Sequence, residues 1–227
     1  LTEHLLDHGL FDTWQGVQEM PRVKTRATGA RLDRTIWVVN ETLLGKMHSA
    51  TRELLGKGVE LADRLQGEVV GVSIGSNHDD YAAELAAYGA DRVLRLEGPQ
   101  LADYSPEGYA NALARAIQEF RPYAVLIPAT VKGRDFAPRV AAHLQLGLTG
   151  DAIGLEIDEQ ERLVQLKPAF GGNIVAPILS KTFPQMATVR PGMLQAMHPD
   201  WSRQPSIQRL ELADVGPIRT QTVQATQ

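Results

Sequence analysis

A short segment in the middle of the sequence combines a hydroxyl, two cations and a glycine at the expected start of a helix. Four of its residues, Thr130, Gly133, Arg134 and Asp135, are candidates for an anion-binding loop, and Lys132 would add positive charge. Backbone N–H groups at a helix start can hold a phosphate or a carboxylate. The simpler alternative is that Thr130 or Asp135 caps the helix while Arg134 pairs with an acidic neighbour. The sequence leaves both interpretations open.

A glycine pair marks a second place where the backbone needs unusual freedom. Gly171, Gly172 and Asn173 tolerate positive φ, so they predict either a plain hairpin turn or a backbone held close against a partner. The apolar strand that follows contains Ile174 and Ile178, in a region where the helices have run out. Exposed apolar strands must be covered by something. These five residues are therefore candidates for a partner interface.

The sequence excludes much of enzymatic chemistry. It contains no cysteine, which rules out disulfides, Cys-ligated zinc, iron–sulfur clusters and thiol catalysis in this chain. It contains neither a Gly-x-Gly-x-x-Gly after the first apolar run nor a Gly-x-x-x-x-Gly-Lys-Ser/Thr loop. The six histidines stand in unrelated contexts, and we interpret His143 as a structural or interface residue. We therefore predict no catalytic residues.

The remaining charged groups have simple interpretations. His4 and His8 lie one helical turn apart and could ligate a metal, but exposed histidines reach this spacing by chance, so we predict no metal site. The pair Asp79-Asp80 is a favourable charge at a helix start. With 23 basic and 27 acidic side chains, the net charge of −4 does not favour nucleic-acid binding. No apolar run reaches the roughly 18 residues of a membrane span.

Four strand–helix units position these groups. Short apolar runs predict strands that are buried on both faces, and each is followed by apolar residues at helical spacing. Ser49, Asp79-Asp80 and Ser105-Pro106 are expected helix starts. The predicted strands are 36–39, 69–74, 93–96 and 123–128. This alternation predicts a three-layer α/β fold with a mostly parallel sheet.

Beyond residue 149 the helices stop. Residues 153–157 and 163–166 flank a polar turn and predict a hairpin, and 174–179 and 186–189 predict two more strands. We expect these strands to form an antiparallel extension of the sheet. We expect residues 1–34 to form a helix and a linker arm, because Leu5, Leu6, Leu10, Trp14 and Val17 have helical spacing. Residues 193–227 are expected to hold one strand, at 207–212, and a linker.

An ordered series of motifs resembles the α subunit of electron transfer flavoprotein. The strongest block is GRDFAPRVAAHL at 133–144. The others are 38–41, 124–130, 147–151, 168–173 and 187–192. The resemblance implies an α/β domain of the adenine nucleotide α hydrolase type over 35–192, with 193–227 leading toward an FAD-binding domain that lies outside this sequence.

The resemblance also implies a function. In that family this domain packs against the β subunit. FAD is bound mainly by the other α-subunit domain, and the complex carries electrons from flavin dehydrogenases to an acceptor. We therefore expect an electron-carrier scaffold subunit that has no catalytic residues of its own and is not an enzyme. FAD is expected in the complete complex and none on this chain alone. Lack of cysteine and of targeting signals favours a bacterial or archaeal cytoplasm.

The sequence leaves one alternative function open. A domain of this fold could be a stand-alone module that binds AMP or ATP beyond the strand ends, near Asn40, Gly75 and Thr130. The missing glycine-rich phosphate loop argues against this alternative. A hydrolase on the same fold ranks last, because the sequence offers no nucleophile or base for it.

Overall fold

The computed structural model describes residues 20–23, 30–76 and 81–220. Three predictions lie outside these residues. They concern the helix of the first 19 residues, the pair His4 and His8, for which we predict no metal site, and the Asp79-Asp80 helix start.

The apolar runs form the interior of one parallel sheet. β1 (Ile36–Val39) and β6 (Ala124–Pro128) are buried over their whole length, as strands covered on both faces must be. β4 (Val69–Gly75) and β5 (Arg92–Glu97) continue the sheet on one side of β1. The strand order is β12-β5-β4-β1-β6-β11-β7, and every pair is parallel. The predicted three-layer α/β fold is confirmed.

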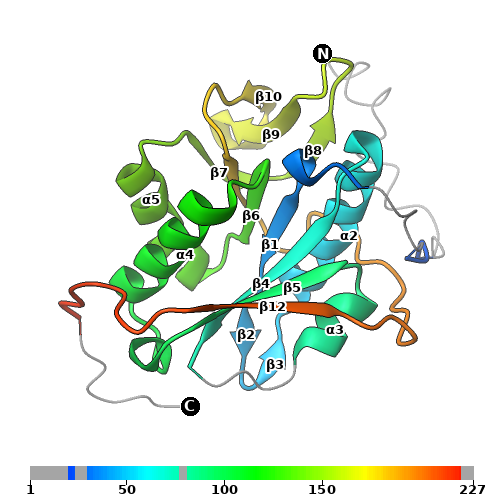
Figure 1. Ribbon diagram of the computed structural model, residues 1–227. Coiled ribbons are helices and arrows are strands. Elements are labelled where there is room, and N and C mark those ends of the chain that lie inside the picture. The colour runs from blue at the N-terminus through cyan, green and yellow to red at the C-terminus, as the bar shows by residue number, and fades with distance from the viewer. Residues whose placement is uncertain (1–19, 24–29, 77–80, 221–227) are drawn as a thin grey trace.

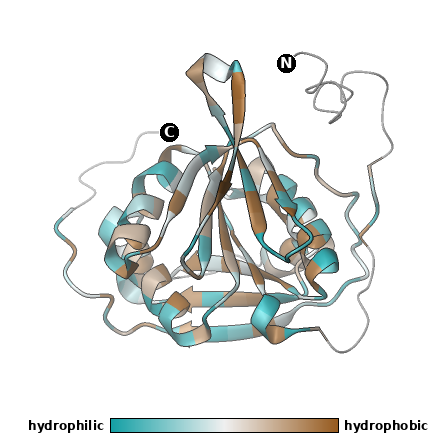
Figure 2. Ribbon diagram, turned by 90° about the horizontal axis from the view of Figure 1, so that it is seen from above, coloured by the Kyte–Doolittle hydropathy of each residue, from teal (hydrophilic) through white to brown (hydrophobic). Residues whose placement is uncertain are grey.

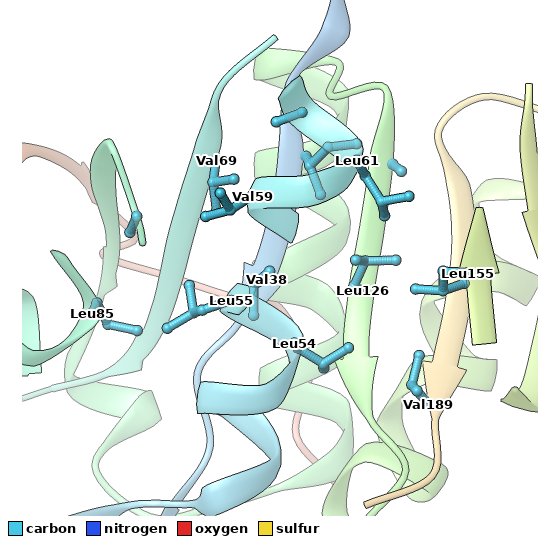
Figure 3. Close-up of a cluster of buried hydrophobic side chains, with 14 of the residues drawn as sticks. Val38, Leu54, Leu55, Val59, Leu61, Val69, Leu85, Leu126, Leu155 and Val189 are labelled. Atoms are coloured by element: carbon cyan, nitrogen blue, oxygen red, sulfur yellow. The ribbon is translucent and has the colours of Figure 1, made fainter. Parts of the chain in front are cut away.

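Helices cover both faces of this sheet. Successive strand residues point to opposite faces, so Val38 packs with α2 (Ser49–Leu65) and α3 (Tyr81–Ala87), whereas Trp37 packs with α4 (Pro106–Phe120) and α5 (Val131–Leu144). Figure 2 shows the helices in two groups on either side of the central strands. In Figure 3 the α2 side chains Leu54 and Leu55 pack toward Val38 and its neighbours.

The observed starts of α2 and α4 agree with the predicted ones, with one correction. Ser105 caps α4 by accepting a hydrogen bond from Gly108 N at 3.2 Å, and Pro106 is the first helical residue, as predicted. Ser49, the expected cap of α2, is already helical. The cap is His48, whose backbone is extended and whose Nδ1 accepts from Ala50 N at 3.1 Å. His48 takes this place because a small hairpin, β2 (Thr42–Leu43) with β3 (Lys46–Met47), runs directly into the helix.

The antiparallel strands form a sheet of their own. β8 (Gly154–Ile157), β9 (Leu163–Ala169) and β10 (Ile174–Leu179) are joined in the order β10-β9-β8, and they lie beyond β7 (Leu148–Ala152) in Figure 1. β11 (Gln185–Val189), which we expected among these strands, instead inserts parallel between β6 and β7. Its residues are all buried, and only the interior of the main sheet covers both faces of a strand.

The segments at either end of the described chain are tied to the sheet. β12 (Ser206–Glu211) is the predicted C-terminal strand and forms the edge beside β5, so it shares a sheet with the 35–192 segment. The boundary expected at 192 stays a prediction. Arg31, directly before the short helix η2 (Leu32–Arg34), and Arg34, its last residue, both pair with Glu161 at 3.0 Å. The buried carboxylate of Glu68, the residue directly before β4, pairs with Arg92, the first residue of β5.

Candidate functional site

The predicted anion loop lies where β6 ends and α5 begins. Thr130 caps the helix, and its Oγ1 accepts from Gly133 N at 3.1 Å. The same hydroxyl donates to the carboxylate of Glu41, in the loop after β1. Glycine is required at 133 because a Cβ there would stand 1.8 Å from the carbonyl oxygen of Pro128. The helix therefore starts in close contact with the end of β6.

The charged side chains of this loop have protein partners. Arg134 Nε donates to Asp151 Oδ1 at 2.9 Å. Asp135 accepts from the Tyr104 hydroxyl at 2.9 Å and pairs with Arg139 at 3.3 Å. Burial, followed by the hydrogen bond to Asp135, raises the pKa of Tyr104 well above its ordinary value of 10.0. These contacts match the simpler sequence interpretation, in which Thr130 caps and Arg134 pairs, and anion binding by the loop stays a prediction.

A cavity opens beside this loop, at the carboxyl ends of the parallel strands. It has a volume of about 300 Å³ and is lined by the chain after β1, β4 and β6. Asn40 and Gly75, two of the three places named for nucleotide binding, line it directly. Thr130, the third, reaches its wall through the hydrogen bond to Glu41. Sequence reasoning grouped the three strand ends because parallel strands end at one edge, but it did not detect the Glu41–Thr130 contact.

The glycine pair forms the turn of the hairpin that joins β9 to β10. Residues Phe170–Gly172 make the short helix η4, and Gly171 and Gly172 have φ of 70° and 92°. Both values favour glycine. Asn173 N donates to Phe170 O at 3.4 Å and closes the turn. The plain turn, one of the two interpretations, is thus present, and the hairpin projects from the body of the domain in Figure 2.

The projecting hairpin carries exposed apolar side chains. Phe170 is 80% exposed and Ile174 45% exposed, while Ile178 is half-buried. Ile178 pairs with Gln165, which is fully buried. Because alternate residues of a strand share a face, Ile174 lies on the same face of β10 as Ile178. This face therefore continues from the buried part of the strand to the exposed end of the hairpin. We call Phe170, Ile174 and Ile178 the hairpin patch. Sequence reasoning missed Phe170, although an aromatic residue directly before a glycine turn was a usable signal.

The described residues contain no group of three or more His, Asp or Glu side chains placed to hold a metal ion. Within the same part of the chain, no helix is both long enough and apolar enough to cross a membrane.

Comparisons with known proteins agree with this architecture. A family model described as the electron transfer flavoprotein domain matches residues 36–215. The electron transfer flavoprotein subunit α of Thermoanaerobacterium thermosaccharolyticum is 42% identical over 163 residues, which are 71% of this chain and 49% of the relative. The chain spans about half the length of the curated relatives that it matches.

Other relatives carry names of enzyme complexes. Subunit LctC of the lactate dehydrogenase (NAD(+),ferredoxin) of Acetobacterium woodii is 41% identical over 177 residues, 78% of this chain and 42% of the relative. The acryloyl-CoA reductase electron transfer subunit β of Anaerotignum propionicum is 37% identical over 186 residues, 71% of this chain and 51% of the relative. Together with the family match over most of the sequence, these identities show that the chain belongs to the electron transfer flavoprotein family.

Proposed function

We propose that this chain is the N-terminal scaffold portion of an electron transfer flavoprotein α subunit. It acts in an αβ complex that contains FAD and carries electrons from flavin dehydrogenases to a downstream acceptor. The single observation that carries the proposal is the family match over residues 36–215. The relatives named as α subunits, whose identity to this chain reaches 42%, support the same role.

The hairpin patch is the proposed contact with the β subunit. Phe170 and Ile174 present apolar surface at the end of a hairpin that the rest of the described chain leaves open. Burying such surface is the main favourable term in most protein–protein association. The two turn glycines have no neighbouring atom within 4 Å of a Cβ position, so a partner backbone could approach them closely. Phe170, with most of its ring exposed, is the best anchor in the patch.

The cavity at the strand ends is too small for a complete FAD molecule. At about 300 Å³ the cavity is at the lower limit for small-ligand sites, and FAD joins two nucleotide-sized halves. The proposal therefore assigns FAD to the complete complex. There the flavin supplies the electron chemistry, and this chain supplies a rigid core and a docking surface.

The proposed role is that of a carrier subunit and not of an enzyme in its own right. Some relatives are named as parts of a lactate dehydrogenase or an acryloyl-CoA reductase. A scaffold portion in such an assembly needs positioned surfaces rather than an acid, a base or a nucleophile. The electron donor and acceptor would then be set by the other subunits, in a complex that works in the cytoplasm.

Mixing experiments test the proposal. The purified chain and a purified β subunit of the same family, from the organism that encodes this chain, are combined and analysed by size-exclusion chromatography with light scattering. The proposal predicts a complex of one chain with one β subunit. A chain that stays monomeric at micromolar concentrations of both proteins would contradict it.

A further inference from the structure

The turn between β8 and β9 is tied to the main sheet by two arginines and a tyrosine. The Glu161 carboxylate in this turn accepts from Arg31 Nη1 at 3.0 and 3.2 Å and from Arg34 Nη2 at 3.0 Å. The Arg34 guanidinium lies 5.0 Å from the centre of the Tyr123 ring. The Tyr123 hydroxyl donates to the backbone oxygen of Glu161 at 2.6 Å. These four residues, which we call the turn clamp, hold the turn against the chain that leads into β1 and β6.

The backbone of Glu161 has a conformation that favours glycine. Its φ is 58°, in the left-handed region, where a side chain such as glutamate costs free energy. Asp158 fixes the rest of the turn, since its Oδ1 accepts from the backbone N–H groups of Gln160 and Arg162, both at 2.9 Å. A glycine at position 161 would fit this turn without strain. Strain of this kind points to a role for the side chain, which here is the carboxylate that joins the two arginines.

The packing between the antiparallel sheet and the main sheet is imperfect. Leu155 and Leu163 are buried there, and Gln165, the next residue of β9 on the same face as Leu163, is fully buried as well. Within the described residues, neither amide atom of Gln165 has a hydrogen-bond partner, and a buried amide without partners weakens the contact that buries it. Farther along, β9 is half-buried, and Lys167 Nζ donates to Gly150 O at 2.5 Å. Packing therefore holds the antiparallel sheet less firmly than a wholly apolar contact would.

β9 connects the clamped turn to the hairpin patch as a stiff arm. It starts beside the turn at Leu163 and ends at Ala169, directly before Phe170. A strand rises about 3.3 Å per residue, so its two ends lie about 20 Å apart. Hydrogen bonding to β8 on one side and to β10 on the other keeps the three strands together as one unit. A tilt of this unit about its buried middle would move the turn and the hairpin patch together, and the clamp opposes that motion at the turn.

We propose that the turn clamp fixes the orientation in which the antiparallel sheet presents the hairpin patch to a β subunit, with Glu161 as the positioning residue. The inference rests on the docking role proposed above for that patch. Glu161 acts through the sheet, because it lies beside the end of β9 that is opposite the patch. Without the clamp the sheet occupies several tilts, and only a fraction of the molecules are ready to dock. The apparent affinity for the β subunit then falls in proportion to that fraction.

Distances between two spin labels test the orientation on the full chain without a partner. The sequence contains no cysteine, so Asn173→Cys at the hairpin and Glu119→Cys on α4, both at exposed positions, place the labels unambiguously. The distribution of distances between the labels should be narrow with the clamp intact and wider in Glu161→Gln. Glu161→Gly should widen it equally, yet melt at a higher temperature than Glu161→Gln, because glycine removes the backbone strain. A purely structural role of Glu161 would instead make the width follow the melting temperature.

The matched control is Glu84→Gln on α3, because Glu84 pairs with Arg52 at 2.8 Å and Arg52 in turn lies 5.3 Å from the centre of the Tyr88 ring. It should leave the distribution of distances narrow.

Binding of the unlabelled chains to the β subunit, measured by calorimetry, completes the test. Affinity should weaken about fivefold in both Glu161 variants, as for loss of one partly exposed ion pair, and stay unchanged in Glu84→Gln. A narrow distribution in both Glu161 variants would overturn the clamp, and a wide distribution with unchanged affinity would overturn its role in docking. If the unaltered chain does not bind, the proposed function fails, whereas the label distances still decide whether the clamp sets the orientation.

Discussion

Replacing Ile174 by aspartate separates docking from folding. Complete burial of an isoleucine side chain contributes about 1.5–3 kcal/mol. Ile174 keeps 45% of its surface exposed, so a partner covering it would gain about 1 kcal/mol. A polar group buried without a partner costs about a further 1–3 kcal/mol. The sum of about 2–4 kcal/mol corresponds to an affinity about 30-fold to 700-fold weaker.

The same change should have little effect on the folded chain. Ile174 stands at the first position of β10, beside an exposed turn, so aspartate there loses mainly strand propensity, about 1 kcal/mol at most. The melting temperature should then fall by about 2–4 °C. Ile178→Asp should follow the same pattern with a larger loss of stability, because Ile178 is half-buried and pairs with the buried Gln165.

The assay compares affinity for the β subunit, by calorimetry, with the melting temperature. Ile207→Asp is the matched control, because Ile207 is 43% exposed on β12, at the opposite edge of the main sheet. It should bind the β subunit like the unaltered chain. Equal losses of affinity in Ile174→Asp and Ile207→Asp, or losses of affinity and stability in proportion, would refute the assignment of the interface to the hairpin patch.

Three further predictions concern the fold around the strand ends and the sheet. Gly133→Ala should lower stability by about 3 kcal/mol, and the melting temperature by about 6–12 °C, because the new Cβ would collide with a carbonyl of β6; Gly150→Ala, with no atom within 4 Å, should have little effect. Because the pKa of Tyr104 is raised when folded, the folded chain holds this proton more tightly, so stability should fall as pH rises above about 10. Urea unfolding at several alkaline pH values should show a shallower fall for Tyr104→Phe. Arg92→Met should cost about 2 kcal/mol in thermal unfolding, because it leaves the buried Glu68 carboxylate unpaired, and adding Glu68→Gln should recover part of it.

The alternating part of the fold could be predicted because local pattern and tertiary role coincide there. A run such as 124–128 is buried on both faces, and Pro106 suits the first position of a helix, where its missing N–H removes no intrahelical hydrogen bond. β11 could not be placed in the same way. Its five residues look alike in a parallel or an antiparallel sheet, and its neighbours β6 and β7 are set by long-range packing.

The candidate sites were predictable only in part. The turn at Gly171 follows from local backbone freedom, and the meeting of Asn40 with Gly75 follows from the geometry of parallel strands. The contact of Glu41 with Thr130 joins residues 89 positions apart, and no local pattern encodes it. The exposure of Ile174 likewise depends on how far the hairpin projects beyond the sheet, which is a property of the whole fold.

The most direct test of the central claim is an absorption spectrum of the purified chain, recorded alone and after co-expression with the β subunit, with mass analysis of released small molecules. The account predicts a complex with the β subunit, no flavin band on the isolated chain, and a flavin band when the rest of an α subunit is present. Flavin on the isolated chain would contradict the assignment of FAD to the complete complex, and failure to form any complex would contradict the scaffold role itself.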